Sequence, residues 1–434
     1  MDELCLEPLH PQKHLQMLYT PFGKRTLYNS VCYCTRCAMC AQTCPVYRLS
    51  HQETLSPRGR NQVLRLALEG KIKLVPHDPA LKNLLLTCTL CGRCSQACAG
   101  KIPTAEHVLE MRRALHLRVL PRLLHYFLQL RNTFPRLFYV FVRISLFLRN
   151  LGLLGLARRI GLTRLPGFSW LNRMDGLLPP HISTLPRLMR QAGIKLSTQK
   201  PSLIYLPSLE AEFILPQIAV QTLRQVQKTS RPTVWFNTPS GLFSYIYGDL
   251  RQSRQAVRRI IQRHSNTANG NLPLLTDSID VYHFLKKAPQ LFSGNDFWEE
   301  RARHLADCLR FVTDFMPANE KGKSPLQGTV QLEYGALFKR EGKPFEQAEQ
   351  ILSTFFGKNF VHCLYTDPDV VVFGYDFTIQ NCAEKIGLEV VKKIARTQTK
   401  HSFALSGLAA LELTYYLKQF YPAAQAEHLV FLAR

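Results

Sequence analysis

Two short cysteine runs constrain this 434-residue chain more than any other feature of its sequence. The first run, CTRCAMCAQTCP, covers residues 34–45, and the second, CTLCGRCSQACAG, covers residues 88–100. In each run the four cysteines are separated by two, two and three residues, so one spacing occurs twice. The repetition predicts one kind of site, built twice. The eight positions are Cys34, Cys37, Cys40, Cys44, Cys88, Cys91, Cys94 and Cys98.

The spacing suits a cubane iron–sulfur cluster. Three thiolates placed three residues apart reach three corners of such a cluster from one tight loop, and in two-cluster ferredoxins the fourth cysteine binds the other cluster. The sequence therefore predicts two 4Fe-4S clusters that exchange their fourth ligands, so neither run is a complete site. The first cluster takes Cys34, Cys37, Cys40 and Cys98, and the second takes Cys88, Cys91, Cys94 and Cys44.

Structural zinc is the competing interpretation of the two runs. Zinc sites generally use two separated CxxC-type pairs in tetrahedral geometry, which three closely spaced cysteines plus a fourth suit poorly. Pro45 follows Cys44 as in ferredoxins, whereas Cys98 is followed by Ala99 and a proline comes only at Pro103. The absence of a proline directly after Cys98 weakens the prediction of a ferredoxin-like turn there, but it removes no cysteine ligand.

The residues between the runs predict a helix over 54–70, because apolar residues recur there at helical spacing and Gly70 closes the segment. Arg58 and Arg60 stand at its start. Two interpretations of these arginines stay open. Either they offset the negative charge of thiolate-bound clusters and so raise the reduction potentials, or they are solvated loop charges.

The order of motifs over residues 31–115 resembles the iron–sulfur subunit of bacterial glycolate oxidase. It runs CxxCxxCxxxCP, SPRGR, a helix, a second CxxCxxCxxxC and the turn AGKIPT. The lactate-utilisation and anaerobic glycerol-3-phosphate dehydrogenase iron–sulfur subunits are similar. The resemblance implies a subunit that passes electrons from a flavoprotein dehydrogenase, which holds the FAD, to a membrane acceptor such as quinone. It implies that the chain is an electron-transfer subunit rather than an enzyme by itself.

An arginine-rich segment follows. Between Met111 and Arg173 there are twelve Arg, no Lys and no acidic residue, which supplies half of the formal net charge of +24. Pro121 and Pro135 predict helix starts. For the helix after Pro135, the free energy of crossing a membrane is near zero at best. A helix that lies in the membrane interface, with its apolar side down and its arginines toward acidic headgroups, accommodates all of its residues. Docking to another subunit is the alternative. The candidate membrane contacts are Arg136, Arg143, Arg149, Arg158 and Arg159.

The C-terminal half predicts two rounds of alternating strands and helices, which implies parallel sheets. The first round has strands at 202–206, 233–236 and 272–275 and a helix at 249–264. The second has strands at 328–334, 370–373 and 428–434 and a helix at 383–397.

We therefore expect an α+β multidomain chain. It should comprise an N-terminal extension (1–30), a mainly helical two-cluster ferredoxin-like domain (31–118), Arg-rich amphipathic helices and a linker (119–197), and two similar α/β lobes with parallel sheets (198–320 and 325–434).

The resemblance also implies Cys-Cys-Gly repeats in the two lobes, but their cysteines are absent. Leu209, Pro239, Ser240, Ser278 and Val281 stand at those positions in the first lobe, and Ala336, Val372, Phe373, Ser406 and Ala409 in the second. Val, Ala, Pro and Phe bind no metal, so we expect degenerate lobes without a cluster. The losses argue against the alternative of a heterodisulfide-reductase-like catalytic subunit. A further alternative is an iron–sulfur redox sensor or scaffold. Two clusters with exchanged ligands favour electron transfer over this alternative.

The first thirty residues lack the basic start, apolar run and cleavage site of a secretory signal. This predicts a cytoplasmic protein, where thiols stay reduced, attached peripherally to the inner face of the cytoplasmic membrane. The basic charge alone would suit nucleic acid, but the sequence contains none of the usual recognition modules, so no nucleic-acid partner is expected.

Overall fold

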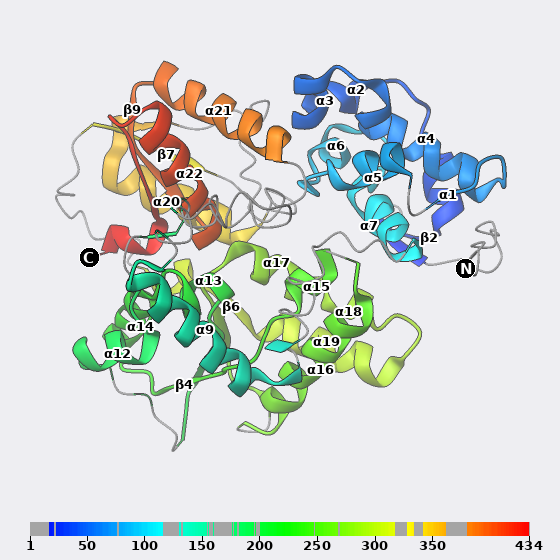
Figure 1. Ribbon diagram of the computed structural model, residues 1–434. Coiled ribbons are helices and arrows are strands. Elements are labelled where there is room, and N and C mark those ends of the chain that lie inside the picture. The colour runs from blue at the N-terminus through cyan, green and yellow to red at the C-terminus, as the bar shows by residue number, and fades with distance from the viewer. Residues whose placement is uncertain are drawn as a thin grey trace.

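The computed structural model describes residues 17–20, 23–75, 78–115, 130–131, 133–153, 155, 159, 176, 178–179, 182–194, 196, 200–246, 248–267, 270–316, 328–333, 342–361 and 380–433. Within them the chain forms a helical N-terminal unit and two α/β lobes, each with a parallel sheet (Figure 1). The chain is thus α+β and multidomain, as its sequence predicts. The residue boundaries given above for the domains stay a prediction.

The N-terminal unit opens with an antiparallel hairpin of β1 (Met17–Thr20) and β2 (Gly23–Thr26) and continues as short helices. Ser56 caps the longest of them by accepting a hydrogen bond from the Gly59 N–H, and Pro57 occupies its first turn. The helix predicted over 54–70 is therefore present as α4. The helices are α1 (Leu27–Cys32), α2 (Met39–Thr43), α3 (Pro45–Ser50), α4 (Pro57–Leu68), α5 (Pro79–Leu86), α6 (Arg93–Ala97) and α7 (Thr104–Ala114).

The segment between this unit and the lobes contains α9 (Pro135–Asn150) and α12 (Leu185–Gln191). Pro135 starts α9, as predicted, while Pro121 lies outside the described residues. The sequence did not predict α12, whose buried Leu185 and Met189 pack into the core of the lobes.

The two lobes share one strand order. The first sheet reads β4-β3-β5-β6 and the second β10-β9-β7-β8, with every pairing parallel. Counted from the first strand of each lobe, both orders are 2-1-3-4, so the expectation of two similar parallel lobes is confirmed. The strands are β3 (Leu203–Tyr205), β4 (Thr233–Trp235), β5 (Leu274–Thr276), β6 (Leu309–Phe311), β7 (Thr329–Glu333), β8 (Phe360–Val361), β9 (Thr399–Ala404) and β10 (Gln425–His428).

Helices connect the strands and cover the sheets (Figure 1). In the first lobe they are α13 (Leu209–Phe213), α14 (Pro216–Lys228), α15 (Leu242–Ile246), α16 (Leu250–Ser265), α17 (Ile279–Lys286), α18 (Ala288–Leu291) and α19 (Asp296–Cys308). In the second lobe they are α20 (Lys343–Phe356), α21 (Gln380–Arg396) and α22 (Gly407–Phe420). The helices predicted at 249–264 and 383–397 correspond to α16 and α21.

The strand predicted over 428–434 is wrong. β10 ends at His428, and Leu429–Ala433 form a 3-10 helix. Leu429 and Val430 are consecutive and both fully buried, as are the residues of strand β3, so the apolar run did not distinguish a strand from a 3-10 helix. The strand predicted at 370–373 lies outside the described residues, whereas the other four predicted strands overlap β3, β4, β5 and β7.

The N-terminal unit is fixed to both lobes. Its core residues, such as Leu85 and Val108, belong to the same buried cluster as Phe284 of the first lobe. Lys287 forms a 3.0 Å ion pair with Glu106 across this boundary. On the other side, α21 of the second lobe packs against α3 (Figure 1). The cysteine loops are therefore held in one packed body with the lobes.

The lobes meet at the carboxyl ends of their strands. The Ile279 N–H donates to the Leu405 carbonyl at 2.9 Å, and His428 Nε2 donates to the Asp277 carbonyl at 2.9 Å. A Cβ added to Gly407 would lie 2.6 Å from Cγ of Glu210, so only glycine permits this approach. Each lobe thus covers the carboxyl ends of the strands of the other lobe.

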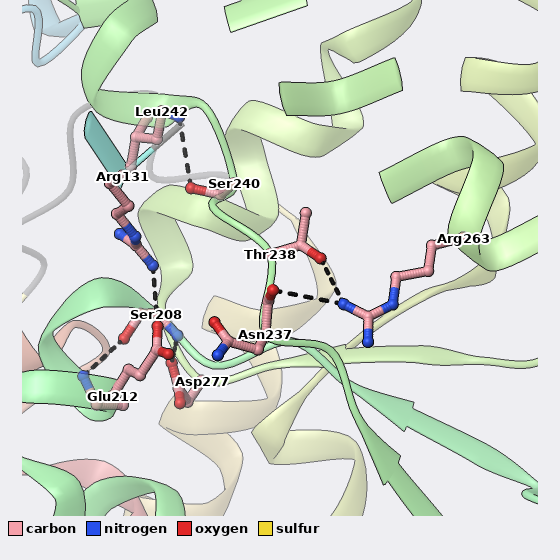
Figure 2. Close-up of polar contacts among 10 residues, drawn as sticks. Arg131, Ser208, Glu212, Asn237, Thr238, Ser240, Leu242, Arg263 and Asp277 are labelled. Atoms are coloured by element: carbon pink, nitrogen blue, oxygen red, sulfur yellow. Dashed lines mark hydrogen bonds and ion pairs between the residues drawn. The ribbon is translucent and has the colours of Figure 1, made fainter. Parts of the chain in front are cut away.

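Buried carboxyl groups lie at this junction. Burial raises the pKa of Glu210 to about 8, and the charge of Asp277 acts in the same direction. Burial also raises the pKa of Glu212 to about 6, although Arg131 opposes the shift by donating to Glu212 Oε2 at 3.0 Å (Figure 2). The junction therefore favours a protonated Glu210.

We expect Glu210→Gln to remove a pH dependence of stability. The folded state keeps the Glu210 proton up to about pH 8, whereas the unfolded state loses it near pH 4.5. Stability should therefore fall by about 1.4 kcal/mol per pH unit between these values, and the glutamine should abolish that loss. Denaturant midpoints at pH 5, 6.5 and 8 measure it. The exposed Glu300→Gln is the control. Equal slopes for wild type and Glu210→Gln would contradict the expectation.

Candidate metal centre

The two cysteine loops have the same backbone course. Arg36 and Ala38 have φ angles of 61° and 69°, and Leu90 and Gly92 in the second loop have 55° and 71°. In each loop a five-residue helix follows at once, α2 or α6, and ends at the fourth cysteine in extended conformation. Left-handed φ values are costly for residues other than glycine, so the folded chain holds strain in both loops. The sequence repeat is therefore also a structural repeat.

One group of thiols draws on both runs. Cys44, Cys88, Cys91 and Cys94 line a single cavity, and of the four only Cys44 is fully buried. Burial raises the pKa of the Cys94 thiol, and the neighbouring thiols of Cys91, Cys88 and Cys44 raise it further. The structure thus brings the last cysteine of the first run to the first three of the second.

The other group combines three cysteines of the first run with the last cysteine of the second. Burial raises the pKa of the Cys40 thiol to about 11, and Cys34, Cys98 and Cys37 also act on it. Cys98, the last cysteine of the second run, therefore stands among the first three of the first run. The eight thiols are grouped as the exchanged-ligand hypothesis requires, while their role as ligands stays a prediction.

The chemistry of the cavity lining fits a 4Fe-4S cluster. Four cysteine thiolates are the donor set of such a cluster, and Arg60 in the same lining offsets their negative charge. All eight cysteines are free thiols. Among the described residues, no three His, Cys, Asp or Glu side chains are placed to hold one metal ion.

The two groups differ in their access to solvent. In the first group Cys37 is exposed, and its neighbours Tyr33 and Met39 are 58% and 60% exposed. A hydrogen bond from the Met39 backbone lowers the pKa of the Cys37 thiol. In the second group Cys44 is only 8% exposed. The first group is therefore more accessible to solvent than the second, while the other three cysteines of each group are partly buried.

The arginines predicted to tune the site have unequal surroundings. Arg60 is 1% exposed, lines the cavity of the second group, and donates to the Leu84 carbonyl at 3.0 Å and to Thr87 Oγ1 at 2.9 Å. Its charge opposes the rise that burial causes in the pKa of Cys44. Arg58 lies near Cys37, but its guanidinium pairs with Glu53.

Residues 30–102 match the 4Fe-4S dicluster domain. The match covers all eight cysteines together with Arg58 and Arg60. The resemblance to iron–sulfur subunits, based on sequence motifs, is thereby confirmed for this segment.

Curated relatives carry names from the predicted group. The chain is 37% identical over 93 residues to lactate utilization protein B of Macrococcus caseolyticus, which is 21% of this chain and 18% of the relative. It is 29% identical over 106 residues to a probable glycolate oxidase iron–sulfur subunit of Bacillus subtilis, which is 24% and 23%. With lactate utilization protein A of Oceanobacillus iheyensis it shares 24% identity over 176 residues, 39% of this chain and 69% of the relative.

The chain therefore spans less than a quarter of the length of the first two relatives. No solved structure matches the chain.

Arg112 is a residue of this region that motif reasoning missed. Fully buried in α7, it donates to the Leu85 carbonyl at 2.6 Å and to the Cys88 carbonyl at 2.9 Å. It also reaches the Ile246 carbonyl in the first lobe at 3.2 Å. One guanidinium thus satisfies carbonyls at the end of α5, fixes the start of the second cysteine loop and contacts the lobe. In the sequence Arg112 follows the cysteine region and belongs to no motif, so only its charge could be predicted.

A buried polar chain holds the helices of the N-terminal unit together. His107 lies 2.9 Å from Ser30 Oγ through Nε2 and 2.7 Å from Asn61 Oδ1 through Nδ1, while Asn61 Nδ2 donates to Thr104 Oγ1 at 3.0 Å. These residues come from α1, α4 and α7. Burial lowers the pKa of His107 to about 4, so its ring stays neutral.

The arginines predicted as membrane contacts differ in their exposure and contacts. Arg143 and Arg159 are exposed. Arg149 instead donates to its own chain, at 2.7 Å to the Pro179 carbonyl and 3.4 Å to the Leu178 carbonyl. The side chain of Arg136 and the whole of Arg158 lie outside the described residues. No helix in the described part of the chain has the length and apolar character needed to cross a membrane.

The positions of the lost Cys-Cys-Gly cysteines lie at strand ends. Leu209, Ser240 and Ser278 follow β3, β4 and β5 of the first lobe, and Figure 2 shows the loops that carry Ser208, Ser240 and Asp277. Asp277 Oδ1 accepts from the Ser208 N–H at 3.0 Å, so a carboxylate occupies this end of the sheet. Ser406 and Ala409 begin α22 at the junction, whereas Ala336, Val372 and Phe373 lie outside the described residues.

We expect Asn61→Leu to destabilise the N-terminal unit by about 2–4 kcal/mol, because it leaves buried His107 and Thr104 without this partner. The free energy of denaturant unfolding measures the loss. Asn83→Leu makes the same substitution at an exposed position of α5 and should cost less than about 0.5 kcal/mol. Equal effects of the two substitutions would contradict a structural role for the buried chain.

Proposed function

We propose that this chain is the iron–sulfur electron-transfer subunit of a membrane-associated oxidoreductase complex. Two 4Fe-4S clusters relay electrons from a flavoprotein dehydrogenase of glycolate, lactate or glycerol-3-phosphate type, which carries the FAD, toward quinone. The observation that carries the proposal is the cavity that Cys44 shares with Cys88, Cys91 and Cys94. It gathers the donor set of one cluster from two separate runs.

The chain's own residues hold, shield and bias the sites. Cys44, Cys88, Cys91 and Cys94 hold one cluster, and Cys34, Cys37, Cys40 and Cys98 hold the other. A bound cluster supplies a one-electron carrier whose potential depends on nearby charge, hydrogen bonds and solvent. Arg60 places a buried positive charge at the cavity of the second group, and its hydrogen bonds to Leu84 and Thr87 keep it there.

The two thiol groups differ in their access to a partner protein. A partner protein would reach the first group through exposed Cys37, whereas Cys44 of the second group is buried. Cys40 of the first group is among the charges that act on Cys94 of the second, so the groups are neighbours. The first group would thus hold the cluster nearer to a partner, and the second would hold its cluster beside α7.

Names of relatives support the complex and its partners. Similarity to a glycolate oxidase iron–sulfur subunit and to lactate utilization proteins favours a flavoprotein dehydrogenase as electron donor. Quinone as acceptor and the inner face of the cytoplasmic membrane as location complete the proposal. The lobes, with Leu, Pro and Ser at the positions of the lost cysteines, serve as a docking scaffold.

We expect Cys44→Ala to damage the cluster of the second run. Iron content should fall from about eight to about four atoms per chain, because one of two 4Fe-4S clusters is lost. The electron paramagnetic resonance spectrum of the reduced Cys44→Ala protein should match that of Cys91→Ala, since both substitutions affect the same cavity.

Cys37→Ala and Cys98→Ala are the matched controls. Their residual spectra should match each other and differ from the Cys44→Ala spectrum. A Cys44→Ala spectrum that instead matched Cys37→Ala would show that each run binds its own cluster, and the exchanged assignment would be wrong.

We expect Arg60→Gln to lower one cluster potential by about 50–100 mV, because a buried charge in a low dielectric acts strongly. Arg58→Gln should change either potential by less than about 20 mV, since Glu53 and solvent already offset its charge. Redox titration followed by electron paramagnetic resonance measures both. Arg60→Lys retains the charge and should restore most of the shift. Equal shifts for Arg58→Gln and Arg60→Gln would contradict this ranking.

A further inference from the structure

Helix α9 and its flanks carry large apolar side chains that are exposed in the described part of the chain. Fourteen large apolar side chains are exposed in the described residues, and nine of them lie between Phe134 and Leu153. Eight of them recur at three- and four-residue spacing along one side of the helix, and Leu153 lies beyond its end. The set, called the α9 face below, comprises Phe134, Leu137, Val140, Phe141, Ile144, Phe147, Leu148, Leu151 and Leu153.

The opposite side of α9 is fixed to the first lobe. Phe138 is 1% exposed, and its ring packs edge-on against Phe213 at 5.5 Å between centroids. Arg131, just before the helix, is anchored by Glu212, and Arg149 near its end donates to the Pro179 carbonyl. The helix is thus pinned at both ends and along one side. It lies flat on the lobe and turns the α9 face outward.

The α9 face is an extended apolar surface. Sixteen residues of helix extend for about 24 Å, so the exposed stripe is long as well as apolar. Contiguous apolar patches of several hundred Å² on soluble proteins mark sites that bind a membrane or another protein. The face therefore requires a covering surface.

Charge decides which surface fits. Residues 111–173 contain twelve Arg and no acidic residue, and Arg143 and Arg159 are exposed along the helix and beyond it. An in-plane helix with Phe, Leu and Ile on one side, bordered by arginines, is the composition of interfacial membrane helices. Anionic headgroups attract such arginines with about 1 kcal/mol each.

We propose that the α9 face docks the protein on an anionic lipid bilayer, with α9 parallel to the membrane plane. The apolar side chains enter the boundary between headgroups and acyl chains, and Arg143 and Arg159 contact the headgroups. The inference rests on surface chemistry alone and holds whether or not the clusters carry electrons. It gives the proposed relay a defined orientation, with the first lobe against the membrane.

Vesicle flotation of the purified full chain tests the proposal. Vesicles of phosphatidylcholine with about one third phosphatidylglycerol are compared with pure phosphatidylcholine. Wild-type protein should float with the anionic vesicles and bind at least about fivefold more weakly to the neutral ones. Ile144→Glu combined with Phe147→Glu should reduce anionic binding by more than about tenfold, because two charges enter the apolar boundary. Arg143→Gln should reduce it about fivefold.

Val75→Glu combined with Phe297→Glu is the matched control. It adds two carboxylates at side chains that are 51% and 56% exposed and remote from α9, and it should bind vesicles nearly as wild type does. Iron content should stay unchanged in all variants, so failure of docking is distinguishable from failure of the cluster assignment.

Two outcomes would overturn the proposal. In the first, Ile144→Glu with Phe147→Glu binds anionic vesicles as well as wild type does. In the second, the wild-type protein binds neither kind of vesicle, and sedimentation shows a dimer that the same substitutions dissociate. A second copy of the chain would then cover the α9 face.

Discussion

The approach of Cys44 to Cys88, Cys91 and Cys94 is the contact on which the rest of the N-terminal unit depends. These residues are more than forty positions apart, yet they line one cavity whose walls also include residues of α3, α4 and α7. Because each thiol group takes its fourth member from the other run, neither loop can complete its group without the other. The helices between them are consequently short and packed around the cysteine loops.

Buried cations and neutral polar groups stabilise this arrangement. Arg60 and Arg112 reach the carbonyls at the end of α5, where a helix leaves its last carbonyls without intrahelical partners. Each therefore supports the loop that follows and leaves positive charge close to the second thiol group. Through Ile246, Arg112 also joins this loop to the first lobe. The same interactions that stabilise the fold thus set the electrostatics of the cavity.

Much of the site could be predicted because its information is local. Spacing alone gave the eight cysteines, and the repeated spacing gave the grouping in which the structure places them. Alternation of strands and helices gave two parallel lobes. Other features depend on contacts distant in sequence. The carbonyls that Arg112 binds, the neutral surroundings of His107 and the burial of Glu210 between lobes leave no periodic pattern. The strand predicted at 428–434 failed because two consecutive buried residues, Leu429 and Val430, look the same in a strand and in a tight turn.

We propose that one chain holds two cubane 4Fe-4S clusters. Iron and acid-labile sulfide analysis of the full chain, purified without oxygen and combined with Mössbauer spectroscopy, tests this proposal. Two such clusters require about eight iron and eight sulfide per chain, all in 4Fe-4S form. Four iron atoms or fewer in fully folded protein, or zinc in their place, would contradict it.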